Sequence, residues 1–414
     1  MTLKPLKDSR KTPTLDCDVA IVGGGIVGAT LAAALKDSGL NVVIIEARPL
    51  EVAAAKKQAY AMTLLSGGIF EGIGIWQKIL PQITKFSEIN LSDRGGLGVL
   101  FNTADLQTKW LGYVAEHQVV LTALQEFLTA CPNLNWLCPA EVRQVSYHQS
   151  GAEIEVKLGE EIRSLRTKLV VGADGAKSPI RTGADIGTKG WKYWQSCVAF
   201  TIKHSAPRND IAFERFWPTG PMGVLPLSGN RCQIVWTNPH EEAKALQKLE
   251  EDLFLARLAE KTGGLLGKLE LVGDRLLFPV QLMTCNSYTK SRLALIGDAA
   301  HCCHPVGGQG LNLGIRDAAV LAQVLQEATA KGEDIGAIPV LKRYERWRKW
   351  ENFTILGLTD FLDRFFSNNW WPLVTIRSFG LWLMANIPLL KINSLQLMTG
   401  MKGRIPTLAQ TVDS

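Results

Sequence analysis

The segment 297–317, GDAAHCCHPVGGQGLNLGIRD, brings together residue types that bind metals, attack substrates or hold cofactors. Its two histidines and two cysteines are consecutive, at His301, Cys302, Cys303 and His304. Consecutive residues cannot all converge on one tetrahedral ion, because paired zinc ligands are separated by about two to four residues. No lysine or arginine adjoins the cysteines to stabilise a thiolate. We therefore predict no metal site, and we expect both cysteines to be packed and unreactive.

The same segment predicts a loop that holds a flat ring. Its apolar stretch LALIG, 293–297, ends at Asp298, and open parallel sheets bind ligands at the carboxyl ends of their strands. The glycines would let the backbone lie against a ring, and the amides that begin the next helix would stabilise negative charge on it. We expect Asp298 to accept hydrogen bonds from a sugar-alcohol chain. The expected loop residues are Pro305, Gly307, Gly308, Gly310, Leu311 and Asn312.

Residues 16–46 predict a βαβ unit that binds a dinucleotide. An apolar strand at 19–22 leads into G-x-G-x-x-G, then an Ala/Leu-rich helix, then a second strand at 41–45 that ends in an acid. The glycines permit a tight turn, close approach of a pyrophosphate and close packing of the helix. The acid favours FAD or NAD over NADP, and the alternative is a glycine-rich turn in an unrelated α/β protein. The expected contacts are Gly23, Gly25, Ile26, Val27, Gly28 and Glu46.

The remaining elements position these two segments. An apolar strand at 169–172 leads to Asp174 and Gly175, which predicts a second strand end that faces the ligand. The spacing of apolar residues predicts a helix over 111–128. Residues 186–285 have strand-like composition with frequent turn residues, which predicts a mostly antiparallel sheet inserted into an α/β domain.

The composition excludes several classes of protein. The 414 residues are 46% hydrophobic and 20% charged, with a net charge of +6 but no dense basic stripe, so nucleic-acid binding is not expected. The eight cysteines are dispersed and contain no CxxC, which favours free thiols in a reducing cytoplasm. We find no signal peptide and no apolar run of about 18 residues, so no transmembrane helix is expected.

The segment after Tyr344 is aromatic and basic, and two interpretations remain open. Its tryptophans and phenylalanines near arginines and lysines suit a helix that lies on a membrane surface. The alternative is a pair of helices that packs on the domain or on a second subunit. We expect a cytoplasmic protein, with peripheral attachment to the cytoplasmic face of the inner membrane under the first interpretation.

Three motifs in order carry a resemblance to a known family. VAIVGGGIVG, VVGADGAKSPIR and GDAAHCCHPVGGQGLNLGIRDAA resemble the flavin motifs of group A flavoprotein aromatic hydroxylases, most closely the ubiquinone-biosynthesis family of the UbiH/UbiF/VisC type. LGYVAEH, AFERFWPTGPMGVLPL and YERWRK match more diffuse signatures. The resemblance runs from about residue 17 to residue 350.

The resemblance implies a p-hydroxybenzoate-hydroxylase-like fold that binds FAD. The FAD-binding α/β domain, Rossmann-like, would comprise 1–80, 100–185 and 286–350, the substrate-binding β-sheet domain 81–99 and 186–285, and the helical tail 351–414. The nucleotide motif would hold the ADP half, Asp298 the ribityl chain, and Gly310, Leu311 and Asn312 the isoalloxazine, with Asp174 and Gly175 near the pyrophosphate. The chain departs from the family at Gln58, where an arginine is usual and Lys56 or Lys57 would substitute, and at His117, where Asn or Gln is usual.

The implied reaction is hydroxylation of a prenylated phenol or quinone precursor of the ubiquinone or plastoquinone type, through a flavin C4a-hydroperoxide. Its partners would be O₂, NAD(P)H or a ferredoxin-type donor, and a homodimer or a biosynthetic complex. The alternatives are an isoprenoid reductase of the same fold and a flavoprotein scaffold. The protein would contribute orientation, exclusion of water and activation of the phenol. The candidates for catalytic roles are Tyr193, Gln195, Arg215, Trp217, His301, His304 and Pro305, and structural roles for them are equally open.

Overall fold

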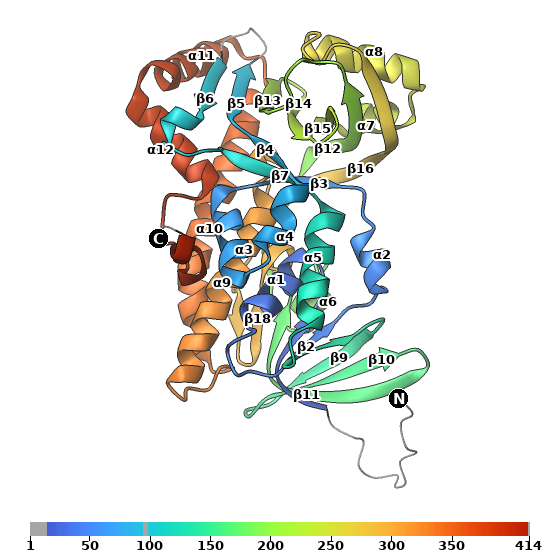
Figure 1. Cartoon of the computed structure of the whole chain (residues 1–414), viewed down its shortest axis with the longest axis vertical. Coiled ribbons are helices and arrows are strands. Elements are labelled where there is room, and N and C mark those ends of the chain that lie inside the picture. Colours follow the sequence, from blue (N-terminus) through green and yellow to red (C-terminus); the bar gives the residue numbers. More distant parts are fainter. Residues whose placement is uncertain (1–14, 94–97, 413–414) are drawn as a thin grey trace.

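The computed structural model describes residues 15–93 and 98–412. The fold has two large sheets, one small sheet and a long helix, α10 (Ile338–Phe366), which contacts both large sheets (Figure 1). This confirms the predicted fold class, a Rossmann-like α/β domain with an inserted, mostly antiparallel sheet and a helical C-terminal region.

The first sheet carries the predicted nucleotide unit. Its strand order is β17-β18-β11-β1-β2-β8, and the pairs β18/β11, β11/β1, β1/β2 and β2/β8 are parallel. Strands β9 and β10 extend it as an antiparallel ribbon from β11. Its strands are β1 (Leu15–Val22), β2 (Val42–Ile45), β8 (Leu134–Leu137), β9 (Glu141–Tyr147), β10 (Ala152–Leu158), β11 (Glu161–Gly172), β17 (Thr289–Lys290) and β18 (Leu293–Leu295).

Helices cover this sheet and seal its core. Strands β2 and β18 are buried along their whole length, as near-continuous apolar runs are in parallel sheets. Helices α1 and α9 pack against each other, and α9 packs on α10. The helices of this region are α1 (Ile26–Ala34), α2 (Leu50–Ala54), α3 (Leu64–Ile73), α4 (Trp76–Ile79), α5 (His117–Thr129), α6 (Pro179–Gly183), α9 (Gln309–Ala330) and α10 (Ile338–Phe366).

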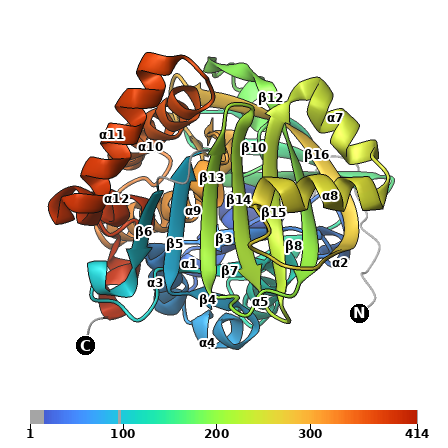
Figure 2. The same cartoon turned by 90° about the horizontal axis from the view of Figure 1, so that it is seen from above.

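The second sheet has the order β19-β16-β12-β15-β14-β13-β5-β6 and is antiparallel except for the β13/β5 pair. Figure 2 shows its central strands side by side, with α7 and α8 at one end and α11 and α12 at the other. Its elements are β5 (Glu88–Asp93), β6 (Gly98–Asn102), β12 (Thr188–His204), β13 (Ile211–Trp217), β14 (Gly220–Leu227), β15 (Arg231–Pro239), α7 (His240–Lys248), α8 (Glu251–Thr262), β16 (Leu269–Cys285) and β19 (His301–Cys302).

A small sheet lies between the two large ones. One of its strands occupies residues for which a helix was predicted. The residues 111–128, expected to be one helix, begin instead with strand β7 (Gly112–Glu116), which pairs with β3 (Ala59–Met62) and β4 (Thr84–Phe86). The helix begins only at His117. Strand pairing with distant segments overrides the local apolar spacing here. Short 3₁₀ turns complete the chain: η1 (Leu80–Gln82), η2 (Thr103–Asp105), η3 (Gly297–Ala299), η4 (Val306–Gly308) and η5 (Thr407–Val412).

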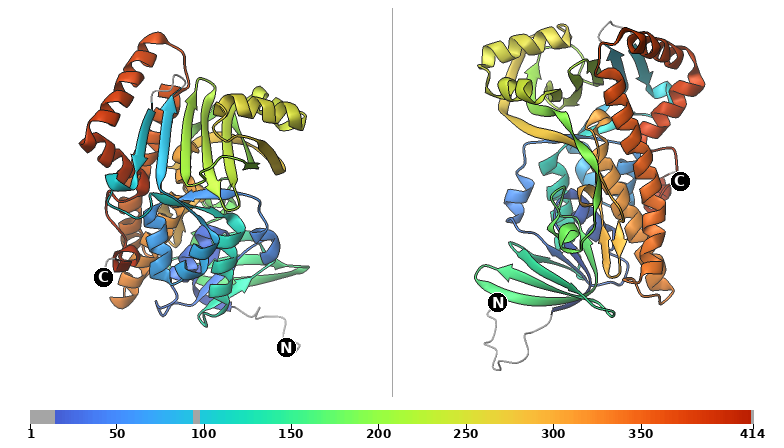
Figure 3. Two further views of the ribbon diagram at one scale, coloured as in Figure 1. Left: turned by 45° about the horizontal axis from the view of Figure 1, so that its top comes forward. Right: turned by 180° about the vertical axis from the view of Figure 1, so that it is seen from behind.

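The C-terminal helices pack on the second sheet. Helix α10 contacts both β17 and β14 and so connects the two large sheets. The right view of Figure 3 shows the course of this long helix. Helix α11 (Trp371–Asn386) lies beside β6, and α12 (Pro388–Thr399) follows after a sharp bend of 96°. Arg377 of α11 is buried and pairs with Asp93 of β5, with Nε 2.7 Å from Oδ2. One face of the tail is therefore part of the domain.

Candidate functional site

The glycine turn after β1 is tightly packed on one side and open on the other. Gly23 has φ +107°, and a Cβ there would lie 2.4 Å from the carbonyl oxygen of Ala173. A Cβ at Gly28 would lie 2.0 Å from the carbonyl oxygen of Gly23. At Gly25, by contrast, a Cβ would meet no atom of the described chain within 4 Å apart from its immediate neighbours. The turn therefore presents bare backbone to an open space, as a dinucleotide site requires.

Glu46 fixes this turn from the end of β2. Its Oε2 accepts a hydrogen bond from the backbone N of Gly24 at 2.8 Å, and its Oε1 accepts from N and Nε of Arg48, both at 3.1 Å. The side chain is buried. A carboxylate offers about four acceptor positions, so capacity remains for a ribose hydroxyl.

The loop 297–312 is held to β3 by one buried amide. Asn312 Oδ1 accepts from the N of Thr63 at 2.9 Å and from Oγ of Ser66 at 2.7 Å. Its Nδ2 donates to the carbonyl oxygens of Ala61 and Gly308, both at 2.8 Å. Gly308 has φ +61°, a conformation that favours glycine. All four bonds of Asn312 are used within the protein, so its side chain shapes the loop.

Asp298 presents its carboxylate to the cavity beside this loop. Desolvation raises its pKa, against the lowering effects of His301 and Lys56. The preceding Gly297 donates its N–H to Oδ2 of Asp317 at 3.0 Å, which fixes the backbone at the end of β18. Of the two cysteines nearby, Cys303 has its pKa raised by burial to about 12, so it is a neutral thiol at pH 7. This agrees with the expected unreactive cysteines.

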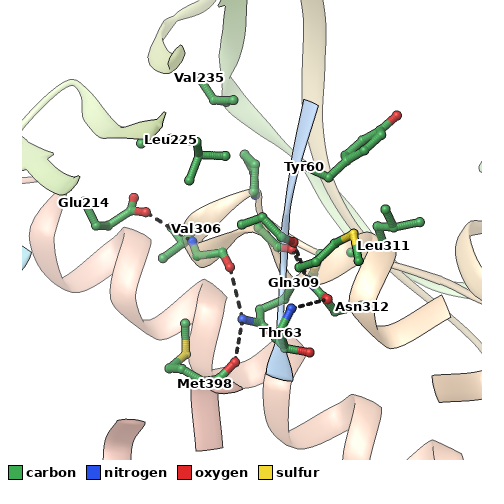
Figure 4. Close-up of a pocket in the computed structure, with 18 of the residues that line it drawn as sticks. Tyr60, Thr63, Glu214, Leu225, Val235, Val306, Gln309, Leu311, Asn312 and Met398 are labelled. Atoms are coloured by element: carbon green, nitrogen blue, oxygen red, sulfur yellow. Dashed lines mark hydrogen bonds between the residues drawn. The ribbon is translucent and has the colours of Figure 1, made fainter. Parts of the chain in front are cut away.

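A cavity of about 700 Å³ connects the two motifs with the second sheet (Figure 4). It begins at the glycine turn, passes the loop 305–312 and continues between β5, β13, β14, β15 and the helices α10 to α12. Gly23, Gly28, Glu46 and Asp174 stand outside its wall. Twelve of the residues expected to contact the cofactor line it: Gly25, Ile26, Val27, Gln58, His117, Gly175, Asp298, Pro305, Gly308, Gly310, Leu311 and Asn312.

Gln58 and His117, the two positions that depart from the family pattern, both contact the hydroxyl of Tyr60. The Tyr60 hydroxyl lies 3.1 Å from Oε1 of Gln58 and 3.3 Å from Nδ1 of His117. His117 Nε2 is 3.1 Å from the carbonyl oxygen of Ala53, so it carries the proton. Desolvation, with Lys56 next in effect, lowers the pKa of His117 to about 4, so the ring is neutral at pH 7.

Three candidates for catalytic roles, Tyr193, Arg215 and Trp217, lie away from the cavity wall. Arg215 donates from Nη1 to the carbonyl oxygen of Thr262 at 2.5 Å, and its guanidinium lies 5.9 Å from the ring of Trp217. Tyr193 donates its hydroxyl to Oδ1 of Asp360 at 2.5 Å. Side chains alternate between the faces of a strand, and Arg215 points away from the cavity. Arg215, Trp217 and Tyr193 are therefore not carried into the proposed mechanism.

The two histidines are buried in polar contacts behind the loop. His304 Nε2 lies 3.4 Å from Oδ1 of Asp363 and 3.4 Å from Oε1 of Gln195, and desolvation lowers its pKa to about 3. His301 Nε2 lies 2.6 Å from Oδ2 of Asp317. Neither ring lines the cavity. Pro305 does line it, directly after His304.

Sequence reasoning missed a carboxylate and an amide at the loop. Glu214, the neighbour of Arg215 on β13, points into the cavity, and its Oε2 accepts from the N of Gly307 at 3.3 Å. Gln309 donates from Nε2 to the carbonyl oxygens of Gly307 and Met398, at 3.1 and 3.2 Å (Figure 4). The alternation of β13 predicts that Glu214 and Arg215 lie on opposite faces, but it does not predict which face meets the cavity. The contact of α12 with the loop had no sequence signal.

These features fit FAD. Gly25 and Gly310 leave backbone exposed to the cavity at the two places where a pyrophosphate and a flat ring would lie. A Cβ at Gly310 would meet only the Cys303 sulfur, at 3.8 Å, among the described residues. Asp174 has a buried Oδ1 without a hydrogen-bond partner in the part of the chain that the structure describes.

Comparison with known proteins decides the family. The family described as "FAD binding domain" matches residues 16–349. The chain is 36% identical to "Ubiquinone hydroxylase UbiL" of Rhodospirillum rubrum, over 88% of this chain and 85% of that protein. The chain belongs to the ubiquinone-biosynthesis family of FAD-dependent hydroxylases. This hydroxylase is also 34% identical to "3-demethoxyubiquinol 3-hydroxylase" of Escherichia coli, over 93% and 98%, and 53% identical to an uncharacterised protein of Synechocystis, over 95% of both chains.

Solved structures give the same fold. The hydroxylase superposes on p-nitrophenol 4-monooxygenase of Pseudomonas putida with a TM-score of 0.80 at 19% identity, over 94% of this chain and 100% of that one. It superposes on PqsL of P. aeruginosa with a TM-score of 0.75 at 22% identity, over 89% and 99%. FAD is therefore its cofactor, and it is an FAD-dependent monooxygenase.

Replacing Lys56 with glutamine is expected to weaken FAD binding by about tenfold to a hundredfold, because a charge-assisted hydrogen bond contributes about 1.5–3 kcal/mol. Lys56 lines the cavity, where desolvation, and then Arg48, lowers its pKa while Glu46 and Asp298 raise it. Lys57→Gln is the matched control, since Lys57 does not line the cavity. Titration of the apoprotein with FAD, followed by flavin fluorescence, measures the FAD affinity of each variant. Equal losses in the two variants would contradict a role for Lys56.

Proposed function

We propose that this enzyme hydroxylates the aromatic ring of a prenylated phenol or quinone precursor, in the biosynthesis of a quinone of the ubiquinone or plastoquinone type. The observation that supports the proposal is the apolar cavity that continues from the flavin loop into the second sheet and the tail helices. Its relatives named for ubiquinone hydroxylation act on substrates of this class. The apolar lining of the far part includes Phe86, Ile89, Leu91, Phe101, Leu225, Val235, Leu362 and Met384.

The chain's own residues would bind FAD along the first part of this cavity. The bare backbone at Gly25 and the first amides of α1 would face the pyrophosphate. Glu46 would bind the ribose, and Asp298 would accept hydrogen bonds from the ribityl chain. The backbone of Gly310, Leu311 and Asn312 would lie along the isoalloxazine, where the first amides of α9 favour negative charge. When bound, the cofactor supplies the activation of O₂.

The overall reaction balances with one O₂ and two electrons. A ring C–H bond becomes C–OH, the second oxygen atom leaves as water, and NAD(P)H and a proton, or a ferredoxin-type protein and two protons, supply the reducing equivalents. The apolar wall would hold the ring and exclude water, which keeps the oxygen chemistry coupled to the substrate. An isoprenoid chain would extend toward Leu362, Met384 and Leu395 of the tail helices, which line the far end.

The tail helices also offer a surface for a membrane. Among the described residues no single helix is long and apolar enough to cross a bilayer, whereas α11 and α12, taken together as a bent pair, have sufficient length and apolar composition. We name Trp371, Phe379 and Trp382 of α11 the aromatic stripe. These three side chains are 75%, 58% and 51% exposed, although Met384 of the same helix lines the cavity. A helix with one face on a bilayer and the other on the cavity would admit a lipid-soluble substrate.

Replacing all three residues of the aromatic stripe with serine is expected to reduce vesicle binding by tenfold or more, because each buried aromatic side chain contributes on the order of 1.5–3 kcal/mol. The assay is sedimentation with vesicles of phosphatidylcholine and phosphatidylglycerol. Trp350→Ser on α10 is the control, since Trp350 is 73% exposed on another helix. Unchanged vesicle binding by the triple variant would contradict the proposed membrane surface.

The absorbance spectrum of the purified protein tests the proposal first. We expect flavin bands that bleach on anaerobic addition of NAD(P)H and return when O₂ is admitted. If NAD(P)H does not bleach the flavin bands, we would infer that a protein donor supplies the electrons. A prenylated phenol that neither binds nor accelerates flavin reduction or reoxidation would contradict the proposed substrate class.

A further inference from the structure

Glu214 lies where the flavin loop meets the apolar wall. It stands on β13, opposite Gly223 of β14 and Leu91 of β5, and its side chain points into the cavity (Figure 4). Oε2 accepts from the N of Gly307 at 3.3 Å. The carboxylate therefore contacts the loop that would carry the isoalloxazine and also faces the space proposed for the substrate ring.

No cation pairs with this carboxylate in the part of the chain that the structure describes, and its hydrogen bond there comes from the N of Gly307. Burial raises the pKa of Glu214 to about 7, although the hydrogen bond from Gly307 lowers it. An acid with a pKa near neutrality is half ionised at the pH at which a cytoplasmic enzyme works. Such groups are effective in proton transfer.

We propose that Glu214 is the residue that accepts the phenolic proton of the substrate, an inference that rests on the proposed function. The O–H bond of the phenol breaks, its proton moves to a carboxylate oxygen of Glu214, and the electron pair stays on the phenolic oxygen. The resulting phenolate donates electron density to the ring carbon that is hydroxylated. The pair of acid and phenol keeps one negative charge throughout, so no further counter-ion is required.

A purely structural role for Glu214 predicts a different response to substitution. Glutamine has nearly the same shape, and its Oε1 can still accept from the N of Gly307. Glu214→Gln therefore preserves the contact with the loop and removes only ionisation. Glu88→Gln is the matched control, because Glu88 lies on the neighbouring strand β5, pairs with Arg208 and does not line the cavity.

The pH dependence is expected from the ionisation of Glu214 itself, whose pKa is shifted by burial and by the hydrogen bond from Gly307. The other titratable groups on the cavity wall are Lys56, Tyr60, His117, Asp298, Cys302 and Cys303, and the elements packed around β13 carry Glu88, Asp93, Asp360 and Asp363 outside that wall. Glu214 must be ionised to accept a proton, so kcat should rise with pH through its pKa and level off above it. Glu214→Gln should lose this rise and lower kcat at pH 8 by about a hundredfold or more.

The direct test uses a chromogenic phenol that ionises at a higher pH than Glu214, 3-nitrophenol with a geranyl chain at carbon 6, bound to the FAD-loaded protein without reductant. At a pH above the pKa of Glu214 and below that of the free probe, the wild type and Glu88→Gln should show the visible phenolate band. In Glu214→Gln the bound probe should stay neutral and the band should fall at least tenfold, with the flavin spectrum unchanged.

The outcomes separate the two proposals. An equal phenolate band in Glu214→Gln and in the wild type would overturn the role of Glu214 and leave the hydroxylase function standing. If the wild type does not bind the probe, the phenolic substrate class fails, and the role of Glu214 fails with it. Loss of the band together with loss of bound flavin would overturn the assignment as well, because Glu214 would then act through the loop.

Discussion

Replacing Gly25 with alanine is expected to weaken FAD binding by about tenfold to a hundredfold while the fold stays intact. Gly25 has φ −71° and ψ −179°, an extended conformation that alanine adopts without strain. A Cβ there would enter the open cavity and meet no atom of the described protein beyond its neighbours. Steric overlap with a ligand costs about 1–3 kcal/mol. The methyl group would therefore weaken FAD binding and leave the folding of the protein unaffected.

Two further glycines make this test specific. Gly357→Ala on α10 is the control, since a Cβ there also meets nothing within 4 Å in the described chain. It should leave FAD binding unchanged and raise the free energy of unfolding by about 0.5–1 kcal/mol, because alanine is favoured over glycine in a helix interior. Gly28→Ala should lower both the free energy of unfolding and the affinity for FAD, because its Cβ would overlap the carbonyl oxygen of Gly23. Apoprotein unfolding in urea and titration with FAD measure the two quantities. Wild-type affinity in Gly25→Ala would show that FAD does not approach this turn.

Replacing Asp317 with asparagine is expected to lower the free energy of unfolding by about 3–5 kcal/mol, the cost of leaving a buried charge without its partner. Asp317 is fully buried on α9. Its Oδ1 accepts from Nε of Arg348 at 2.7 Å and from Nδ2 of Asn352 at 3.1 Å, and its Oδ2 faces Gly297 and His301. Asparagine would remove the carboxylate from Nε of the buried Arg348 guanidinium, which among the described residues would keep its pair with Glu351 at Nη1.

The pH dependence of stability has a defined sign at Asp317. Burial alone would raise its pKa, but His301 and Arg348 hold the pKa well below the ordinary value of 3.8. A carboxylate with a lowered pKa stabilises the folded state above its unfolded pKa, and this contribution is lost as the pH falls below about 4. Urea unfolding at pH 7 and pH 3 should therefore show a smaller difference between wild type and variant at pH 3.

Glu126→Gln is the control for Asp317. It removes the same charge from an exposed pair with Lys78, whose side chains are 52% and 54% exposed, and should change the free energy of unfolding by less than about 1 kcal/mol. An effect of Asp317→Asn no larger than this would contradict the structural importance of the buried cluster.

The sequence was sufficient to predict the parts of the site that local chemistry determines. The turn at Gly23 to Gly28, the acid Glu46 and the loop from Asp298 to Asn312 each depend on the conformation of a short segment, and the corresponding strands and helices are present. Their roles toward FAD remain predictions that the variants above test.

Contacts between distant segments could not be predicted. Strand β7 forms because residues 112–116 pair with β3 and β4. The local sequence contains no pattern that predicts this pairing. Arg215 and Glu214 point to opposite faces of β13, and only the position of the second sheet shows that the face of Glu214 meets the cavity. The contribution of Met398 and Leu395 to the same cavity depends on the bend between α11 and α12.

The most direct test of the account is incubation of the FAD-loaded enzyme with a geranylated phenol, NAD(P)H or a reduced ferredoxin, and ¹⁸O₂, followed by mass spectrometry of the product. Hydroxylation predicts one ¹⁸O atom on the aromatic ring and an isoprenoid chain with its double bonds unchanged. A product that contains no ¹⁸O, or a chain that has gained or lost hydrogen, would contradict the assignment of this enzyme as a ring hydroxylase.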